Sequence, residues 1–307
     1  MSQNINKNAL RMNLFNEGQK ALAALGINED IYICPLCLDE HDRGSLGHDN
    51  GQEPQLTLEH VPPKSVDGKE IILTCKKCNN FAGHAYDAHL AGAGRLHKRS
   101  HGVLIKSDGE YGSVKISAAN ITLNAQIEVK NGGYHFNIIE KTNNPSKIEQ
   151  FADFMHGVKA GSEMTFTFEE RSNPKRANFS LLRSAYLTMV AAFGYTYAFA
   201  QNIQKLRLAI INEQLDFPIR FVYPRNEPGN KIIFINDQKI ALVQFGRVAV
   251  VMPFLHCNEE SYQEITRSAP KISGQYESIK LPQSFIAQLD HSGRYSAKFY
   301  NPPAPAP

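Results

Sequence analysis

Two Cys-x-x-Cys pairs are the feature that most limits how this chain can fold. Cys34 and Cys37 form the first pair, Cys75 and Cys78 form the second, and Cys257 stands alone. Each pair can turn into a tight knuckle that presents two thiolates on one side, and four thiolates are a common ligand set for structural zinc. A metal that joins the pairs would also stabilise a segment that has few large apolar residues. We therefore expect the four paired cysteines to bind a structural Zn²⁺.

The two pairs could also serve as a redox Cys-x-x-Cys motif, or they could be small buried cysteines that are paired by chance. Two copies of the motif favour metal binding over a redox role. A disulfide framework would require an exported protein. The N-terminal segment, MSQNINKNALRMNLF, lacks the continuous apolar core of an export signal. We expect a cytoplasmic protein whose paired cysteines bind metal.

The composition allows a sizeable folded core. The chain has 307 residues, of which 42% are hydrophobic, and this length favours about two domains. The most apolar stretch, residues 185–200, is shorter than the roughly 20 residues that cross a bilayer, so we expect a buried helix there and no membrane association. The net charge of +3 is compatible with nucleic-acid binding but does not indicate it.

Hydrophobic periodicity and capping residues predict helices and strands in mixed order. A helix is expected over residues 9–25, and short strands are expected beside each cysteine pair. Another helix should begin at Asn144, which can cap it, with Pro145 in its first position. Apolar residues then predict a long helix over residues 178–213, and strand-like runs follow it.

This order of elements predicts an α+β fold in two domains. We expect residues 1–100 to form a small N-terminal domain around the cysteine pairs, with an N-terminal helix. Residues 101–300 are expected to form a larger mixed α+β domain. The proline-rich residues 301–307 are expected to form a flexible tail.

The segment between and after the cysteine pairs carries a more specific pattern. Residues 56–83, LTLEHVPPKSVDGKEIILTCKKCNNFAG, contain a strand that ends in Glu59-His60, a turn, a second strand, a Cys-x-x-Cys knuckle and Asn79 at the start of a helix. This pattern resembles the HNH, or ββα-metal, endonuclease family, in particular its zinc-containing members with two Cys-x-x-Cys knuckles. The resemblance covers about residues 30–90 and implies a ββα-metal core there.

The resemblance implies an endonuclease that hydrolyses DNA phosphodiester bonds. Glu59 and Asn79 would supply oxygen ligands to a catalytic Mg²⁺ or Mn²⁺, which polarises the phosphate and stabilises the leaving group. His60 would be the general base that takes a proton from water, a task that an ordinary histidine pKa suits.

The chain departs from the family pattern at two positions. Glu59 stands where aspartate is commoner, and Glu70 stands near the middle asparagine position, where the family residue helps to orient the catalytic histidine. Glu70 could orient His60, another group could do so, or the site could be impaired. Asn80 and His84 are further candidates, either as metal ligands or, for His84, as a contact to the phosphate.

Basic side chains near this segment are candidate contacts to double-stranded DNA, because cations neutralise backbone phosphates without reading the sequence. The candidates are Lys64, Lys76, Lys77, Arg95, Lys98 and Arg99. The cluster that begins at Arg95 is equally consistent with a solvated linker between the domains.

The larger domain shows no motif with a recognisable chemistry, so we expect it to regulate the core, to sense a signal or to bind a partner. Its ligand would be a protein partner or a small activating molecule. A nuclease core joined to a larger module is typical of effectors in bacterial anti-phage defence, which is an analogy of architecture alone. The alternative function, motivated by Glu70, is a zinc-stabilised nucleic-acid-binding or adapter protein with an impaired HNH site.

Overall fold

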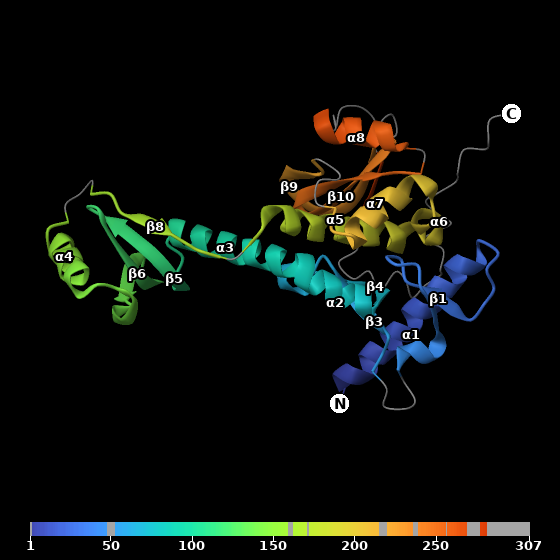
Figure 1. Cartoon of the computed structure of the whole chain (residues 1–307), viewed down its shortest axis with the longest axis horizontal. Helices are drawn as coiled ribbons and strands as arrows, with labels where there is room; N and C mark the ends of the chain where they lie inside the picture. The colour runs from blue at the N-terminus through green and yellow to red at the C-terminus, as the bar shows by residue number, and fades with distance from the viewer. Residues whose placement is uncertain are drawn as a thin grey trace. The chain divides into compact units, whose positions relative to one another are not determined.

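The computed structural model describes residues 2–47, 53–158, 162–170, 172–214, 220–235, 239–255, 257–268 and 277–280. These residues form a mixed α+β structure, which confirms the α+β part of the predicted fold class (Figure 1). The chain divides into two compact units: Met1–Leu90 together with Asn173–Pro307, called unit 1, and Ala91–Ser172, called unit 2. The predicted tail, residues 301–307, lies outside the described residues.

The first half of unit 1 contains the cysteine pairs and a β-hairpin. Helix α1 (Ser2–Ala23) precedes the antiparallel pair β1 (Ile31–Ile33) and β2 (Glu40–Asp42), and the 3-10 turn η1 (Arg43–Leu46) follows. The hairpin consists of β3 (Leu56–Val61) and β4 (Lys69–Cys75), joined through η2 (Lys64–Val66). Helix α2 (Lys76–Ala82), the π-helical turn η3 (Gly83–Asp87) and the start of α3 (Ala88–Leu104) come next.

Helix α1 covers one face of the hairpin. Leu14 and Phe15 of α1 form a buried cluster with Leu56 and Leu58 of β3 and Leu73 of β4. The strand residues fit the alternation of a half-buried strand, in which every second side chain points to the same face. The hairpin also contributes Val61, Ile71 and Ile72 to a second buried cluster.

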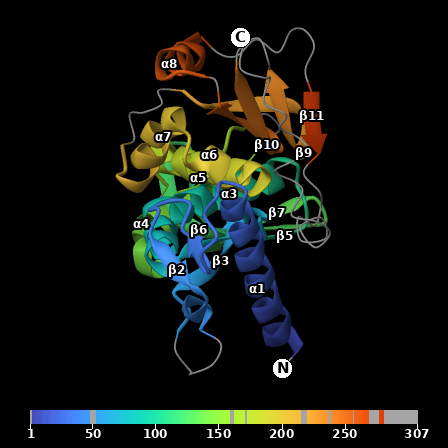
Figure 2. The ribbon, with the colours of Figure 1, turned by 90° about the vertical axis from the view of Figure 1, so that its right-hand side faces the viewer.

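The second half of unit 1 consists of helices against a sheet. The helices are α5 (Pro174–Phe193), α6 (Tyr195–Ala198) and α7 (Gln201–Ile211), and α8 (Glu259–Ser268) follows the last long strand. The antiparallel sheet has the order β10 (Ile240–Pro253), β9 (Val222–Ile235), β11 (Glu277–Lys280). Figure 2 shows α5, α6 and α7 on one side of β9 and β10. The single helix predicted over residues 178–213 is interrupted at Gly194, whose φ of 63° and ψ of −155° end α5.

One hydrophobic core joins the two halves of unit 1. Leu36 and Ile71 from the first half share a buried cluster with Leu182 of α5 and Val251 of β10. The apolar stretch at residues 185–200 contributes to this core, as expected for a buried helix. Within the described residues, no helix combines the length and the apolar character that crossing a membrane requires.

Polar side chains of the second half complete the backbone of the first cysteine knuckle. The hydroxyl of Tyr186 donates to the carbonyl of Pro35 at 2.6 Å, and Nη1 of Arg207 donates to the carbonyl of Leu36 at 2.5 Å. The hydroxyl of Tyr195 bonds to both backbone groups of Ile33. Buried carbonyls need such partners, so the knuckle depends on helices that lie far away in the sequence.

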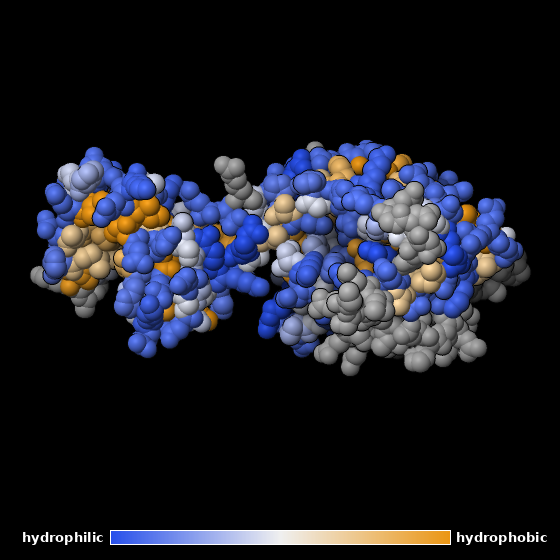
Figure 3. All heavy atoms as spheres, turned by 90° about the horizontal axis from the view of Figure 1, so that it is seen from below, coloured by the Kyte–Doolittle hydropathy of each residue, from blue (hydrophilic) through white to orange (hydrophobic). Residues whose placement is uncertain are grey.

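Unit 2 is an antiparallel sheet with one helix packed on it. The strand order is β7 (Gly133–Ile138), β6 (Ile121–Lys130), β5 (Gly109–Ala118), β8 (Thr165–Thr167), and η4 (Glu140–Thr142) leads to α4 (Pro145–His156). Ala125 and Ile127 of β6 are buried with Phe151 of α4. Asn144 caps α4 by accepting a hydrogen bond from the backbone of Ser146, as predicted. On the face of unit 2 drawn in Figure 3, hydrophobic residues gather between hydrophilic ones.

This division differs from the predicted order, in which residues 1–100 preceded residues 101–300. Unit 2 is an insertion, because the chain leaves unit 1 after Leu90 and returns to it at Asn173. The backbone N–H of Asn173 donates to Nδ1 of His89 at 3.1 Å, so the two ends of the insertion lie side by side. Periodicity reports local structure, and it does not reveal contacts between distant segments such as the two halves of unit 1.

Replacement of unit 2 by a linker tests this division. We expect a chain in which a short Gly-Ser linker replaces residues 91–172 to fold, because the described core of unit 1 uses no side chain of unit 2. Its melting temperature, measured by circular dichroism, should stay within ~5 °C of the full chain.

A chain that ends at residue 172 is the matched control. It lacks the helices that satisfy the carbonyls of Pro35 and Leu36, so it should show no cooperative unfolding. Equal loss of cooperative unfolding in both shortened chains would contradict the division into units.

Candidate functional site

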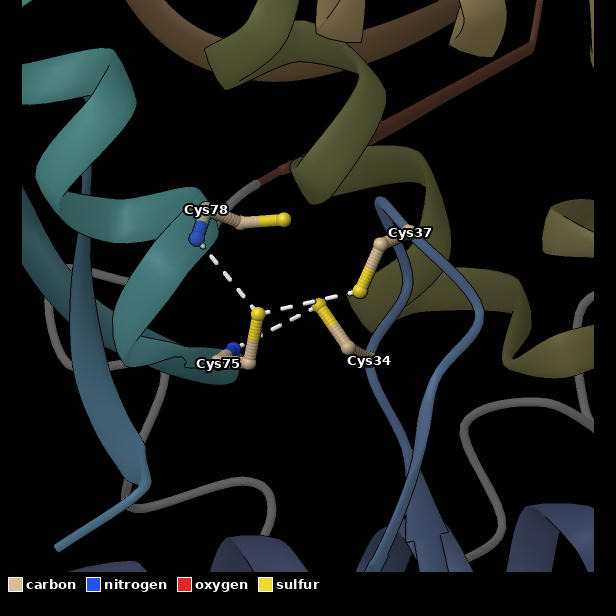
Figure 4. Close-up of side chains that lie close together, drawn as sticks. All are labelled: Cys34, Cys37, Cys75 and Cys78. Atoms are coloured by element: carbon tan, nitrogen blue, oxygen red, sulfur yellow. Dashed lines mark hydrogen bonds between the residues drawn. The ribbon is translucent and has the colours of Figure 1, made fainter.

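The four paired cysteines converge on one point in unit 1, as predicted. Cys34 and Cys37 lie in the turn after β1, Cys75 ends β4, and Cys78 lies in the first turn of α2. Their four sulfurs all lie within 4.8 Å of one another, and the side chains point toward a common centre (Figure 4). Four soft thiolates at this spacing can hold a metal ion and suit zinc.

Backbone N–H groups donate to two of the four sulfurs. The N–H of Cys75 donates to Sγ of Cys34 at 3.4 Å, and the N–H of Cys78 donates to Sγ of Cys75 at 3.4 Å. Hydrogen bonds among the four sulfurs lower the pKa of Cys34 and Cys75 and raise the pKa of Cys37 and Cys78. A cluster of this kind favours a bound cation, because the sulfurs share negative charge at short range.

His41 lies beside the cluster, although its sequence context is an ordinary polar loop. It belongs to β2, which pairs with the strand before the first knuckle. A hydrogen bond with Cys75 raises the pKa of His41, and its Nε2 is buried without a partner among the described residues. Only the pairing of β1 with β2 places this ring near the sulfurs, so the sequence spacing alone did not identify it.

The hairpin brings His60 and Glu70 together. A bulge after Glu59 shifts the register, so that Glu59 pairs with Ile72 whereas His60 pairs directly with Glu70. Nε2 of His60 lies 3.5 Å from Oε1 of Glu70, and the two side chains are 29% and 18% exposed. The histidine is therefore accessible to a ligand, and Glu70 is placed where it can orient the ring.

Glu59 is buried and bound on both oxygens. Nη1 of Arg183 donates to its Oε1 at 3.0 Å, and Nη2 donates to its Oε2 at 2.6 Å. The hydroxyl of Thr74 also donates to Oε2, at 3.0 Å. Both side chains of the ion pair are at most 3% exposed. In this arrangement the carboxylate does not fit the role of a ligand to a divalent ion that also contacts a phosphate.

Asp87 extends the same buried polar group. It ends the π-helical turn η3, and its Oδ1 accepts a hydrogen bond of 2.5 Å from the hydroxyl of Ser180. Its Oδ2 lies 3.9 Å from Nη1 of Arg183. Burial raises the pKa of Asp87. Burial lowers the pKa of Arg183, but the charges of Glu59, Asp87 and Cys78 and the hydrogen bonds to Glu59 together raise it above its ordinary value. Arg183 is thus a charged group between two carboxylates.

The residues after the second knuckle divide between the hairpin and the surface. Asn79 is half-buried, and its Nδ2 donates to Oγ1 of Thr57 at 2.9 Å. This contact places Asn79 against β3, the strand that carries Glu59. Asn80 and His84 are exposed.

Two of the predicted basic contacts in α3 are engaged within unit 2. Nη2 of Arg95 lies 2.7 Å from Glu170, and Arg99 donates to the carbonyl of Tyr111 at 2.6 Å and lies 3.8 Å from Glu170. These contacts favour a structural role for both arginines. Lys98 is exposed beside them.

The lysines near the hairpin differ in their availability. Lys76 forms an ion pair with Glu53. Lys64, in the turn after His60, and Lys77, in α2, are both exposed. Lys64 and Lys77 are therefore the basic residues of this segment that are most available to a phosphate.

A pocket of about 620 Å³ adjoins the hairpin turn. Val61, Pro62 and Lys69 line one side, close in sequence to His60 and Glu70, while Leu181 and Phe245 line the other. Pockets of this volume can hold small molecules, and the walls are mainly apolar.

No family model matches the chain, and searches of curated proteins and of solved structures also found no match. The chemistry of the site is therefore argued from its residues and their contacts alone.

Metal analysis of the purified protein tests the cysteine cluster. We expect about one zinc per chain, because four sulfurs within 4.8 Å of one another supply the four ligands that structural zinc takes. Cys34→Ser should lose the metal and lower the melting temperature by at least ~10 °C, since metal binding contributes directly to folding. Elemental analysis and thermal unfolding measure these effects.

Cys257→Ala is the matched control, because Cys257 is buried outside the cluster. It should keep the full zinc content. Equal zinc in wild type and Cys34→Ser would contradict the assignment.

Proposed function

We propose that this chain is an HNH-type endonuclease that hydrolyses DNA, with His60 as the general base. The observation that carries the proposal is the His60–Glu70 pair, on adjacent strands of a hairpin that leads into a cysteine cluster and a helix. This strand–strand–helix order is the arrangement that the resemblance to the ββα-metal family implies.

The imidazole of His60 is suited to take a proton from a water molecule. Its Nε2 faces Glu70, so Nδ1 is the nitrogen left to accept the proton. Glu70 would hold the ring and stabilise the positive charge that it acquires. A bound Mg²⁺ or Mn²⁺ would supply stabilisation of charge on the phosphate, but the contacts of Glu59 with Arg183 do not support Glu59 as its ligand.

A second candidate function is nucleic-acid binding, or an adapter role, without cleavage. The buried ion pair of Glu59 favours it, because the residue expected to bind the catalytic ion is engaged elsewhere. The four-cysteine cluster and the accessible lysines are compatible with both candidate functions. A measurement of DNA cleavage is therefore needed to distinguish the two.

Plasmid cleavage in the presence of Mg²⁺ or Mn²⁺ tests the first candidate. We expect His60→Ala to slow cleavage at least ~100-fold, because loss of a general base has effects of this size. Glu70→Gln should give a smaller loss. Gel analysis of nicked and linear DNA measures the rates.

His135→Ala is the control, since His135 is exposed on β7 in unit 2. Cleavage by His60→Ala at the wild-type rate would exclude the assigned base. DNA binding without any cleavage by the wild type would favour the adapter role.

DNA affinity at different salt concentrations tests the lysines. We expect the double variant Lys64→Ala/Lys77→Ala to bind DNA about 10-fold more weakly at moderate salt and to show a smaller salt dependence, because two phosphate contacts are lost. Fluorescence anisotropy with labelled duplex DNA measures both quantities.

The double variant Lys141→Ala/Lys147→Ala has the same change in charge on exposed residues of unit 2. It should bind nearly as well as wild type. Equal weakening by both double variants would mean that only the net charge matters.

A further inference from the structure

We propose that Glu59 is the anchor of a buried ion pair rather than an ion ligand, and that Arg183 acts through it as a positioning residue for His60. The second part rests on the proposed function, because it gives Arg183 a role in arranging the general base. The first part depends only on the contacts of the ion pair.

The geometry of the pair is that of a strong, specific contact. Arg183 donates from both terminal nitrogens to both oxygens of Glu59, at 3.0 and 2.6 Å. A two-point contact of this kind fixes the orientation of the carboxylate as well as its distance. Thr74 adds a third hydrogen bond from the neighbouring strand.

Burial makes the two charges depend on each other. Arg183 and Glu59 are 2% and 3% exposed, so either charge alone would lie in the protein interior without solvent. A divalent ion at Glu59 would have to displace the guanidinium, which would keep only its longer contact of 3.9 Å with Asp87. The ion pair is therefore the more stable use of this carboxylate.

The same network joins four elements. Glu59 lies on β3, Thr74 on β4, Asp87 in η3 and Arg183 on α5. Ser180, one turn before Arg183, binds Asp87 at 2.5 Å. Helix α5 is thereby attached to both strands of the hairpin and to the turn that follows α2.

His60 is the next residue after Glu59, at the bulge where the register of the hairpin shifts. A bulge bends its strand and re-aims the side chains beside it. When Glu59 is held by Arg183, the end of β3 is held in place, and with it the backbone that directs His60 toward Glu70.

The test compares single and double replacements in the full chain. The variants are Arg183→Met, Arg183→Lys, Glu59→Gln and the apolar double variant Glu59→Leu/Arg183→Met. Three quantities are measured: the melting temperature, Mn²⁺ binding by electron paramagnetic resonance, and the histidine side-chain signals in ¹H–¹⁵N spectra. His135 provides the control signal.

We expect Arg183→Met and Glu59→Gln to lower the melting temperature by about 10 °C, because each removes the two-point ionic partner of a buried charge. The double variant should recover most of that loss, since two apolar groups replace the pair. The His60 signal should move in Arg183→Lys while the His135 signal stays. Mn²⁺ binding should be the same in wild type and in the double variant.

Two results would overturn the proposal. A tenfold or greater weakening of Mn²⁺ binding in Glu59→Gln and in the double variant would make Glu59 an ion ligand. An unchanged His60 signal in folded Arg183→Lys would remove the positioning role. Neither readout needs cleavage, so an inactive wild type would count against the proposed nuclease without deciding the role of the ion pair.

Discussion

The convergence of four sulfurs is the constraint on which the rest of unit 1 depends. The two cysteine pairs belong to different β-structures, β1 with β2 and β3 with β4, and the cluster joins them. The first knuckle also needs Tyr186 and Arg207 to satisfy its carbonyls. A bound metal with four thiolates carries net negative charge, which the buried cation of Arg207 nearby would partly balance. The helices therefore stabilise the first knuckle, and the knuckle in turn places two of the sulfurs that can bind the metal.

The features that the sequence predicted correctly depend on neighbours along the chain. Paired cysteines identify the cluster because each knuckle brings its own two ligands together. Asn144 followed by Pro145 predicts the start of α4 because capping is a local interaction. The interruption at Gly194 was missed, since its unusual backbone angles follow from packing around α5 and α6 and not from periodicity.

The contacts that decide the chemistry of the site connect distant positions. Glu59 and Arg183 are 124 residues apart, and no spacing rule pairs them. The insertion of unit 2 was equally hidden, because residues on both sides of it belong to one core. The family resemblance identified the hairpin, whereas the partner of its acidic residue comes from a part of the chain that the resemblance does not cover. His60 and Glu70 are two residues of the predicted segment that the hairpin brings together, at 3.5 Å.

The π-helical turn at Gly83–Asp87 has a consequence for the length of this segment. A π-turn holds one more residue than an α-helical turn, and each residue rotates a helix by about 100°. The π-turn takes up one extra residue while Asp87 faces Ser180 and Arg183, so one residue more or fewer with the π-turn kept would rotate Asp87 by about 100° away from them. The number of residues after the second knuckle is therefore constrained together with their chemistry, and insertions or deletions there should be tolerated less than substitutions at its exposed positions.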